Sequence, residues 1–150
     1  MWEQHLQMIR EKMKKYGYAL NNGVAENVIL PFKDAVYEKF NYLLPSDYLE
    51  FLKLMNGFDF NGSIVYGIDQ EFADNTTCQE INGFISYNEI WYENEWLKKY
   101  AFLGEGEMNW YVYNIENNQF QLLDKPSGSL LEEYSSFNAL INYMFVEVLQ

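Results

Sequence analysis

The segment from Leu43 to Ile68 (LLPSDYLEFLKLMNGFDFNGSIVYGI) constrains the fold of this chain more than any other part of it. Pro45 suits the first turn of a helix, and Ser46-Asp47 supply hydrogen-bond acceptors and negative charge there. Asn56-Gly57 is typical of a helix end, because glycine readily adopts the left-handed conformation that a helix C-terminus favours. A second pair, Asn61-Gly62, leads into residues that alternate with the period of a strand. The segment therefore predicts a helix, a sharp stop and then a strand.

The spacing of apolar residues predicts the other elements. Helical spacing indicates further helices over residues 2–16, from Pro31 to residue 43, over residues 88–100 and from Ser136 onward. The inward-facing residues that it predicts are Phe32, Val36, Phe40 and Leu43 in the second helix and Tyr48, Phe51, Leu52 and Met55 in the third. Alternation predicts strands over residues 64–68, 101–103, 110–114 and 119–124, with the last two forming a hairpin. We therefore expect a single domain, residues 1–150, with an α+β fold: N-terminal helices, a central antiparallel twisted sheet and a C-terminal helix packed on it.

Acidic residues outnumber basic ones, and their surplus lies in the middle of the chain. The sequence has 22 Asp and Glu against 10 Lys and Arg, a formal net charge of −12. Residues 57–124 hold twelve acids and two bases, whereas residues 1–56 hold seven of each. Nucleic acids and anionic membranes require a basic footprint, so we expect neither as a partner. A basic protein is the natural complement, because clustered like charge steers association, although loops around a sheet would give the same asymmetry.

The cysteine count and the N-terminus indicate the compartment. Cys78 is the single cysteine, so no internal disulfide forms, which favours a reducing environment. The N-terminal residues lack the apolar core and cleavage site of a secretion signal, and no apolar run reaches transmembrane length. We therefore expect a cytoplasmic protein.

Few residues suit catalysis or metal binding. His5 is the only histidine, and no nucleophile motif surrounds either it or Cys78. A structural zinc site fails on the number of ligands. We therefore expect no enzymatic activity, no cofactor and no metal. One alternative stays open: a carbohydrate-binding or glycan-hydrolysing domain, since carboxylates lie close in sequence to tryptophans. These residues are Glu93, Glu95, Glu105 and Glu107, with Trp91, Trp96 and Trp110.

The opening segment also carries a family resemblance. LPSDYLEFLKLMNGFDFNG followed by IVYGI resembles the signature of the SUKH superfamily, known from cell-wall-assembly regulators and bacterial immunity proteins. The signature falls on Leu44, Pro45, Asp47, Tyr48, Leu52, Asn56 and Gly57. The later segments Gly104-Glu105, WYVYN, FQLLD and Ser136-Phe137 follow in the order of that domain. The resemblance covers residues 31–150 and is closest to the YrhA-like branch.

This resemblance implies a non-enzymatic, protein-binding function. Bacterial members of the superfamily include immunity proteins that bind and neutralise toxin domains, often nucleases. It implies no catalytic residue, because the signature is not a catalytic motif. A second role that the resemblance implies is that of an adaptor in cell-wall regulation. Both a monomer and a homodimer agree with the sequence.

We hypothesise that the partner, a basic toxin domain, binds an acidic face rich in aromatic residues. Large aromatic side chains surrounded by charge have the composition of tight interfaces. The predicted acidic residues are Asp69, Glu71, Asp74, Glu105 and Glu107, with Tyr66, Trp91, Tyr92 and Trp110 as aromatic anchors. For Tyr66 and Trp110, a position in the core is the favoured interpretation.

Overall fold

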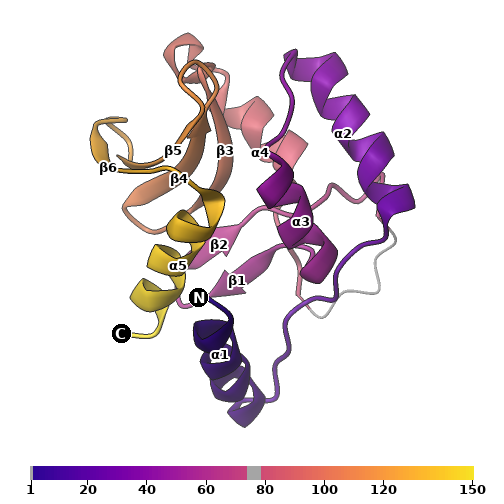
Figure 1. Cartoon of the computed structure of the whole chain (residues 1–150), viewed down its shortest axis with the longest axis vertical. Helices are drawn as coiled ribbons and strands as arrows, with labels where there is room; N and C mark the ends of the chain where they lie inside the picture. Colours follow the sequence, from indigo (N-terminus) through magenta and orange to yellow (C-terminus); the bar gives the residue numbers. More distant parts are fainter. Residues whose placement is uncertain (1, 74–78) are drawn as a thin grey trace.

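The computed structural model describes residues 2–73 and 79–150 as five α-helices, one short 3₁₀ helix and six strands (Figure 1). The elements follow in the order α1 (Glu3–Lys15), α2 (Glu26–Phe40), α3 (Ser46–Leu54), β1 (Phe58–Phe60), β2 (Ser63–Val65), α4 (Phe84–Trp91), η1 (Glu95–Leu97), β3 (Tyr100–Glu105), β4 (Asn109–Asn114), β5 (Gln119–Asp124), β6 (Leu130–Tyr134) and α5 (Phe137–Val148). The predicted α+β fold is therefore confirmed.

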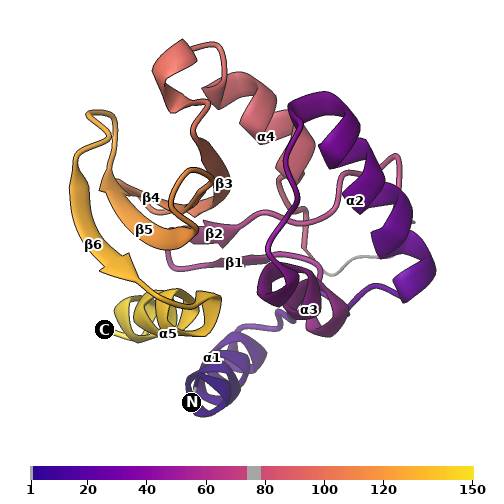
Figure 2. The same ribbon diagram turned by 45° about the horizontal axis from the view of Figure 1, so that its top comes forward.

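The six strands form one antiparallel sheet in the order in which they occur in the sequence. Figure 2 shows α5 against strands β5 and β6 on one side of the sheet, with α1 beside it. The ring of Phe137 in α5 packs on Phe120 of β5. On the other side, Trp91 of α4 packs on Phe102 and Trp110. Successive residues of a strand point to opposite faces, so β4 and β5 separate these two layers of core.

Several elements lie where the sequence predicts them. The first and third helices and the β4–β5 hairpin agree, and all four apolar residues predicted for the third helix are buried. Helix α5 begins after Ser136, whose Oγ accepts a hydrogen bond from the Ala139 amide at 3.1 Å. A side-chain oxygen at this position satisfies one of the free amides of the first turn.

Other boundaries differ from the prediction. Helix α2 begins at Glu26, so Pro31 lies inside it and does not open it, and Leu43 lies beyond its end and is 62% exposed. The buried stripe of α2 begins at Ile29, one turn before Phe32, which extends the helix toward the N-terminus. Helix α4 covers Phe84–Trp91, not residues 88–100. Strands β1 and β6 are absent from the prediction; β1 has three residues, and β6 is exposed and lacks an alternating pattern.

The signature residues connect α3 to the segment that leaves β2. The buried Tyr48 hydroxyl donates to the Tyr66 carbonyl at 2.6 Å, and the Asn56 side-chain oxygen accepts from the Ile68 amide at 2.8 Å. Gly57 has a φ of +81°, and a Cβ there would lie 2.2 Å from the Ile81 side chain. The signature therefore fixes the course of the chain directly after β2.

Helix α4 in turn closes part of the edge of β3. Of β3, strand β2 pairs only with Gly104 and Glu105. The first half of β3 therefore pairs with β4 on one edge and has no neighbouring strand among the described elements on the other. There the fully buried Asn88 donates to the Phe102 carbonyl at 2.9 Å and accepts from the Phe102 amide at 2.8 Å. The side-chain amide of Asn88 thus replaces one residue of a strand.

Candidate functional site

Four residues of the predicted face meet in a cluster on the α4 side of the sheet. The Tyr66 hydroxyl donates to Glu105 at 2.6 Å and accepts from the Trp91 indole nitrogen at 3.0 Å. The ring of Trp91 contacts Trp110 edge-on at 5.3 Å between centroids. Tyr66 and Trp110 are buried, as the core interpretation predicts.

The sequence did not indicate the partner of Glu105. Its carboxylate accepts a hydrogen bond from Lys125 Nζ at 2.8 Å, and the Lys125 and Glu105 side chains are 22% and 16% exposed. Lys125 lies twenty residues further along the chain, so spacing gives no signal for the pair. Glu105 therefore belongs to an internal network, and reversing its charge would disturb the fold as well as any surface.

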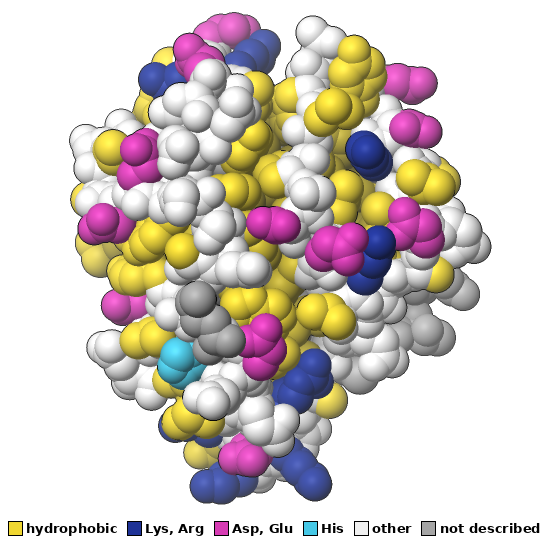
Figure 3. Space-filling view, in the orientation of Figure 1, with side chains coloured by type: hydrophobic (Ala, Val, Ile, Leu, Met, Phe, Trp, Pro, Cys, Tyr) yellow, Lys and Arg dark blue, Asp and Glu magenta, His cyan; other side chains and the backbone are white. Residues whose placement is uncertain are grey.

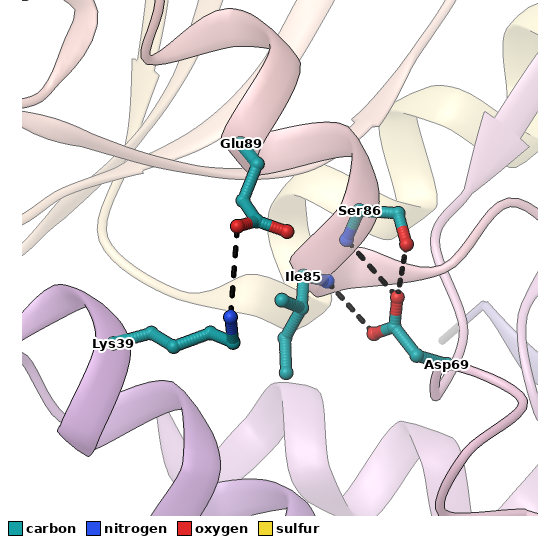
Figure 4. Close-up of polar contacts among 5 residues, drawn as sticks. All are labelled: Lys39, Asp69, Ile85, Ser86 and Glu89. Atoms are coloured by element: carbon teal, nitrogen blue, oxygen red, sulfur yellow. Dashed lines mark hydrogen bonds and ion pairs between the residues drawn. The ribbon is translucent and has the colours of Figure 1, made fainter.

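Asp69 caps helix α4 (Figure 4). It is buried, and its two oxygens accept hydrogen bonds from the Ile85 and Ser86 amides at 2.8 and 3.0 Å and from the Ser86 hydroxyl at 2.8 Å. A carboxylate in this position satisfies free amides and complements the positive end of the helix dipole. Two residues further on, Glu71 is exposed, while Asp74 lies outside the described residues. Figure 4 also shows Lys39 of α2 paired with Glu89 of α4 at 3.6 Å.

Tyr92 lies apart from the Tyr66 cluster. Its hydroxyl donates to the Tyr100 carbonyl and lies 2.7 Å from the Tyr42 hydroxyl, and its ring meets Phe40 edge-on. Burial raises the pKa of Tyr92 well above its ordinary value. The ring is half-buried. Through these contacts, Tyr92 connects α2, α4 and β3.

Glu107 is exposed and, unlike Glu105, lines a pocket of about 210 Å³ on the α5 side. The β1–β2 turn, the β3–β4 turn and the end of α5 form its walls. The residues that line it are Asn61, Gly62, Ser63, Gly106, Glu107, Met108, Asn109, Tyr111, Glu147 and Val148. Glu147 brings a second carboxylate to this pocket, at the negative end of the α5 dipole.

A third carboxylate, Glu132 of β6, continues this acidic surface. Burial raises the pKa of Tyr134 to about 12, and the negative charges of Glu132 and Glu147 add to the shift. The pKa of Tyr143 in α5 is raised by burial and by the same two carboxylates. Both carboxylates therefore raise the pKa of the same two tyrosines, Tyr134 and Tyr143, whose ring centroids lie 6.1 Å apart. We call Glu107, Glu132 and Glu147 the acidic strip.

The acidic strip is a group of carboxylates without a basic partner. By contrast, Glu26, Glu50, Glu89, Glu95 and Glu105 each pair with a lysine. Within residues 2–73 and 79–150, no lysine or arginine forms an ion pair with the strip. Residues 126–150 contain three acids and no base. In Figure 3, Lys and Arg side chains lie at the lower end, where α1 carries Lys12, Lys14 and Lys15 in its last turn, and also at the top and on the right of the view. The flank of β6 and α5 shows acids and neither Lys nor Arg.

Of the residues considered for sugar binding, Trp91, Trp110 and Glu105 lie in the Tyr66 cluster, and the others lie elsewhere. Trp110 is buried and Trp91 is half-buried, whereas Trp96 is 50% exposed and lies against Gly128. Glu95 pairs with Lys98. Among the described residues, no group of three or more His, Cys, Asp and Glu side chains is placed to hold a metal ion.

Comparison with known protein families matches residues 24–143 to the SMI1/KNR4 family (SUKH-1). The match spans most of the chain, which confirms the SUKH superfamily, and this protein belongs to the SMI1/KNR4 family. The match does not separate branches, so the YrhA-like branch stays a prediction. Comparison with curated proteins finds no match. Membership is consistent with a non-enzymatic module of immunity type whose partners are proteins. No helix of the described residues has the length and apolar character needed to cross a bilayer.

Proposed function

We propose that this protein is an immunity protein that binds and neutralises a basic toxin domain. The observation that carries the proposal is the acidic strip: Glu107 and Glu147 line one pocket, and Glu132 and Glu147 both raise the pKa of Tyr134 and Tyr143. None of the three forms an ion pair with a basic side chain among the described residues. Unpaired like charges repel one another, and a basic partner relieves that repulsion on binding. Family membership supports the same class of function.

A nuclease toxin fits this surface well. Proteins that hold a phosphate backbone carry clustered Lys and Arg, which would meet the strip with complementary potential. The net charge of −12 would also speed the encounter at low ionic strength. Next to Glu107, Met108 is 72% exposed and offers an adaptable apolar contact.

The residues predicted from the sequence enter this proposal in different ways. Glu107 lies in the strip, and Glu71 is exposed near the start of α4. We infer that Asp69 and Glu105 act indirectly, by holding α4 and Tyr66, and that Trp91 and Tyr92 support the same region from below the surface.

The test is an affinity pull-down with the tagged protein from its own host cells, at low and moderate salt. The critical variant is Glu107→Lys with Glu147→Lys. Its matched control is Asp34→Lys with Glu38→Lys, which makes the same change in charge on exposed residues of α2. Circular dichroism first establishes that both variants fold.

We expect the wild type and the α2 control to retain one basic polypeptide, and the strip variant to lose it. The captured polypeptide should be toxic when expressed alone and harmless when expressed with the wild type. Recovery of a non-toxic cell-wall regulator would favour the adaptor role instead. Equal capture by all three proteins would remove the strip from the proposal.

A further inference from the structure

We propose that the free edge of β6 binds an extended basic segment of the protein partner as a seventh strand. This inference rests on the proposed function in one respect, namely that the partner is basic. The open edge and its charged side chains are observed in this chain itself. Adding a strand to a sheet edge satisfies main-chain groups of both proteins, while side chains on either side give specificity.

The two edges of the sheet are unequal. At one end, β1 has three residues, and the Gln79 side chain already donates to the Asp59 carbonyl at 2.7 Å. At the other end, β6 has five residues and pairs only with β5 among the described elements. Its Leu130 and Leu131 are 55% and 52% exposed. An open, exposed edge is a template for another strand.

The two glutamates of β6 point to opposite faces of the sheet. Glu133 accepts a hydrogen bond from the Gln121 side chain at 2.6 Å, and Gln121 pairs with Val112 on the face away from α5. Glu132 pairs with Leu122 and lies close to Tyr134 and Tyr143, on the face covered by α5. A strand added to this edge would therefore meet one carboxylate on each face.

This placement defines the segment that fits. Neighbouring residues of a strand alternate between faces, so two adjacent Lys or Arg residues would lie opposite Glu132 and Glu133. The pairing with β5 shifts in register at Leu131, between the pairs Leu122–Glu132 and Leu123–Leu130. Regular pairing on the outer side is therefore expected along Glu132–Tyr134.

A second copy of this chain fits the same edge poorly. Antiparallel pairing of two β6 strands about their centre would bring the glutamates of one copy close to those of the other. Like charges placed opposite one another in a sheet are destabilising. The edge thus disfavours its own copy and admits a segment of opposite charge.

The test uses a defined peptide and not the unidentified partner. A short peptide of valine and threonine with two adjacent central lysines is titrated into the ¹⁵N-labelled protein, and amide shifts and hydrogen exchange are followed by NMR. A peptide with glutamates in place of the lysines controls for sequence. Glu132→Lys with Glu133→Lys tests the edge, and Asp34→Lys with Glu38→Lys is the charge-matched control.

We expect shifts in β6 and β5 and slower exchange of β6 amides with the lysine peptide. Charge reversal on β6 should weaken binding about tenfold or more, because two attractions become repulsions, while the α2 control binds as the wild type does. Absence of shifts at millimolar peptide, shifts centred elsewhere, or binding that survives reversal on β6 would overturn the inference.

The outcome is separable from that of the proposed function. Suppose that a toxin binds the wild type, is lost with reversal at Glu107 and Glu147, and is unaffected by reversal at Glu132 and Glu133. The immunity function then stands and the strand addition fails. If the peptide binds β6 while no toxin is found, the strand addition stands and the immunity function fails.

Discussion

At the scale of single residues, Asn88 joins helix α4 to strand β3. Its side chain donates to the Phe84 and Phe102 carbonyls and accepts from the Phe102 amide, all in a position without solvent exposure. A buried amide and carbonyl that lose their partners keep the full cost of their lost hydration. The attachment of α4 to the sheet therefore includes two hydrogen bonds of one buried side chain.

Replacing this side chain should be costly. We expect Asn88→Ala to lower the free energy of unfolding by about 2–4 kcal/mol, because the amide and the carbonyl of Phe102 both lose their partner. Urea denaturation measures the change. The exposed Asn94, just after α4, provides the control, since Asn94→Ala should change stability by less than about 0.5 kcal/mol. Equal loss in both variants would contradict the role of Asn88.

Tyr111 should make the stability depend on alkaline pH. Burial raises its pKa to about 12 in the folded protein, while an unfolded tyrosine titrates at about 10. The native state thus holds this proton more tightly, so the contribution is fully present below about pH 10 and is lost as the pH rises toward 12. The urea midpoint should fall over that range, and fall less steeply in Tyr111→Phe. Identical slopes in the two proteins would show that Tyr111 titrates normally.

At the scale of elements, the predictable parts have local causes. The third helix and α5 combine an apolar stripe with residues suited to a helix start, and both lie where the sequence places them. The sequence predicts that α2 begins at Pro31, because proline is typical of the first turn of a helix. The helix begins earlier, at Glu26, since the buried apolar stripe already starts at Ile29 and continues past Pro31. Strand β6 escapes prediction because LLEEY does not alternate, and pairing with β5 alone makes it a strand.

The cap of α5 can be tested with two adjacent serines. Ser136 accepts from the Ala139 amide, whereas Ser135 is exposed and its side chain has no hydrogen bond among the described residues. We expect Ser136→Ala to cost about 1 kcal/mol and Ser135→Ala to be nearly neutral. Thermal and urea unfolding of the two variants, side by side, measure the difference. A larger loss of stability in Ser135→Ala than in Ser136→Ala would show that Ser135, and not Ser136, caps the helix.

At the scale of the whole molecule, acidic and basic side chains are unevenly distributed. Helix α1 ends in Lys12, Lys14 and Lys15, while the flank of β6 and α5 carries acids without a base (Figure 3). The sequence showed an acidic surplus and indicated Glu107. It could not indicate Glu132 and Glu147, because their proximity depends on how β6 and α5 pack. Nor could it show that Glu105, two residues before Glu107, belongs to the other side of the sheet.

The charges of β6 should also govern self-association. We expect the wild type to sediment as a monomer, since two copies of net charge −12 repel and the β6 glutamates oppose pairing. Glu132→Thr with Glu133→Thr removes that opposition and adds residues that favour strands, so a dimer should appear. Sedimentation velocity at moderate salt measures both, with Asp34→Thr and Glu38→Thr as the control. A control that dimerises equally would assign the effect to net charge.

The side chains of Tyr48 and Asn56 hydrogen-bond to main-chain atoms, the Tyr66 carbonyl and the Ile68 amide, and this has a consequence for how such a protein can evolve. The frame is held without reference to the side chains on its surface. The exposed residues of β6 and α5 can therefore differ between lineages that inherit the same backbone. Deep mutational scanning would show this as strict intolerance at Tyr48 and Asn56 beside broad tolerance on the outer flank.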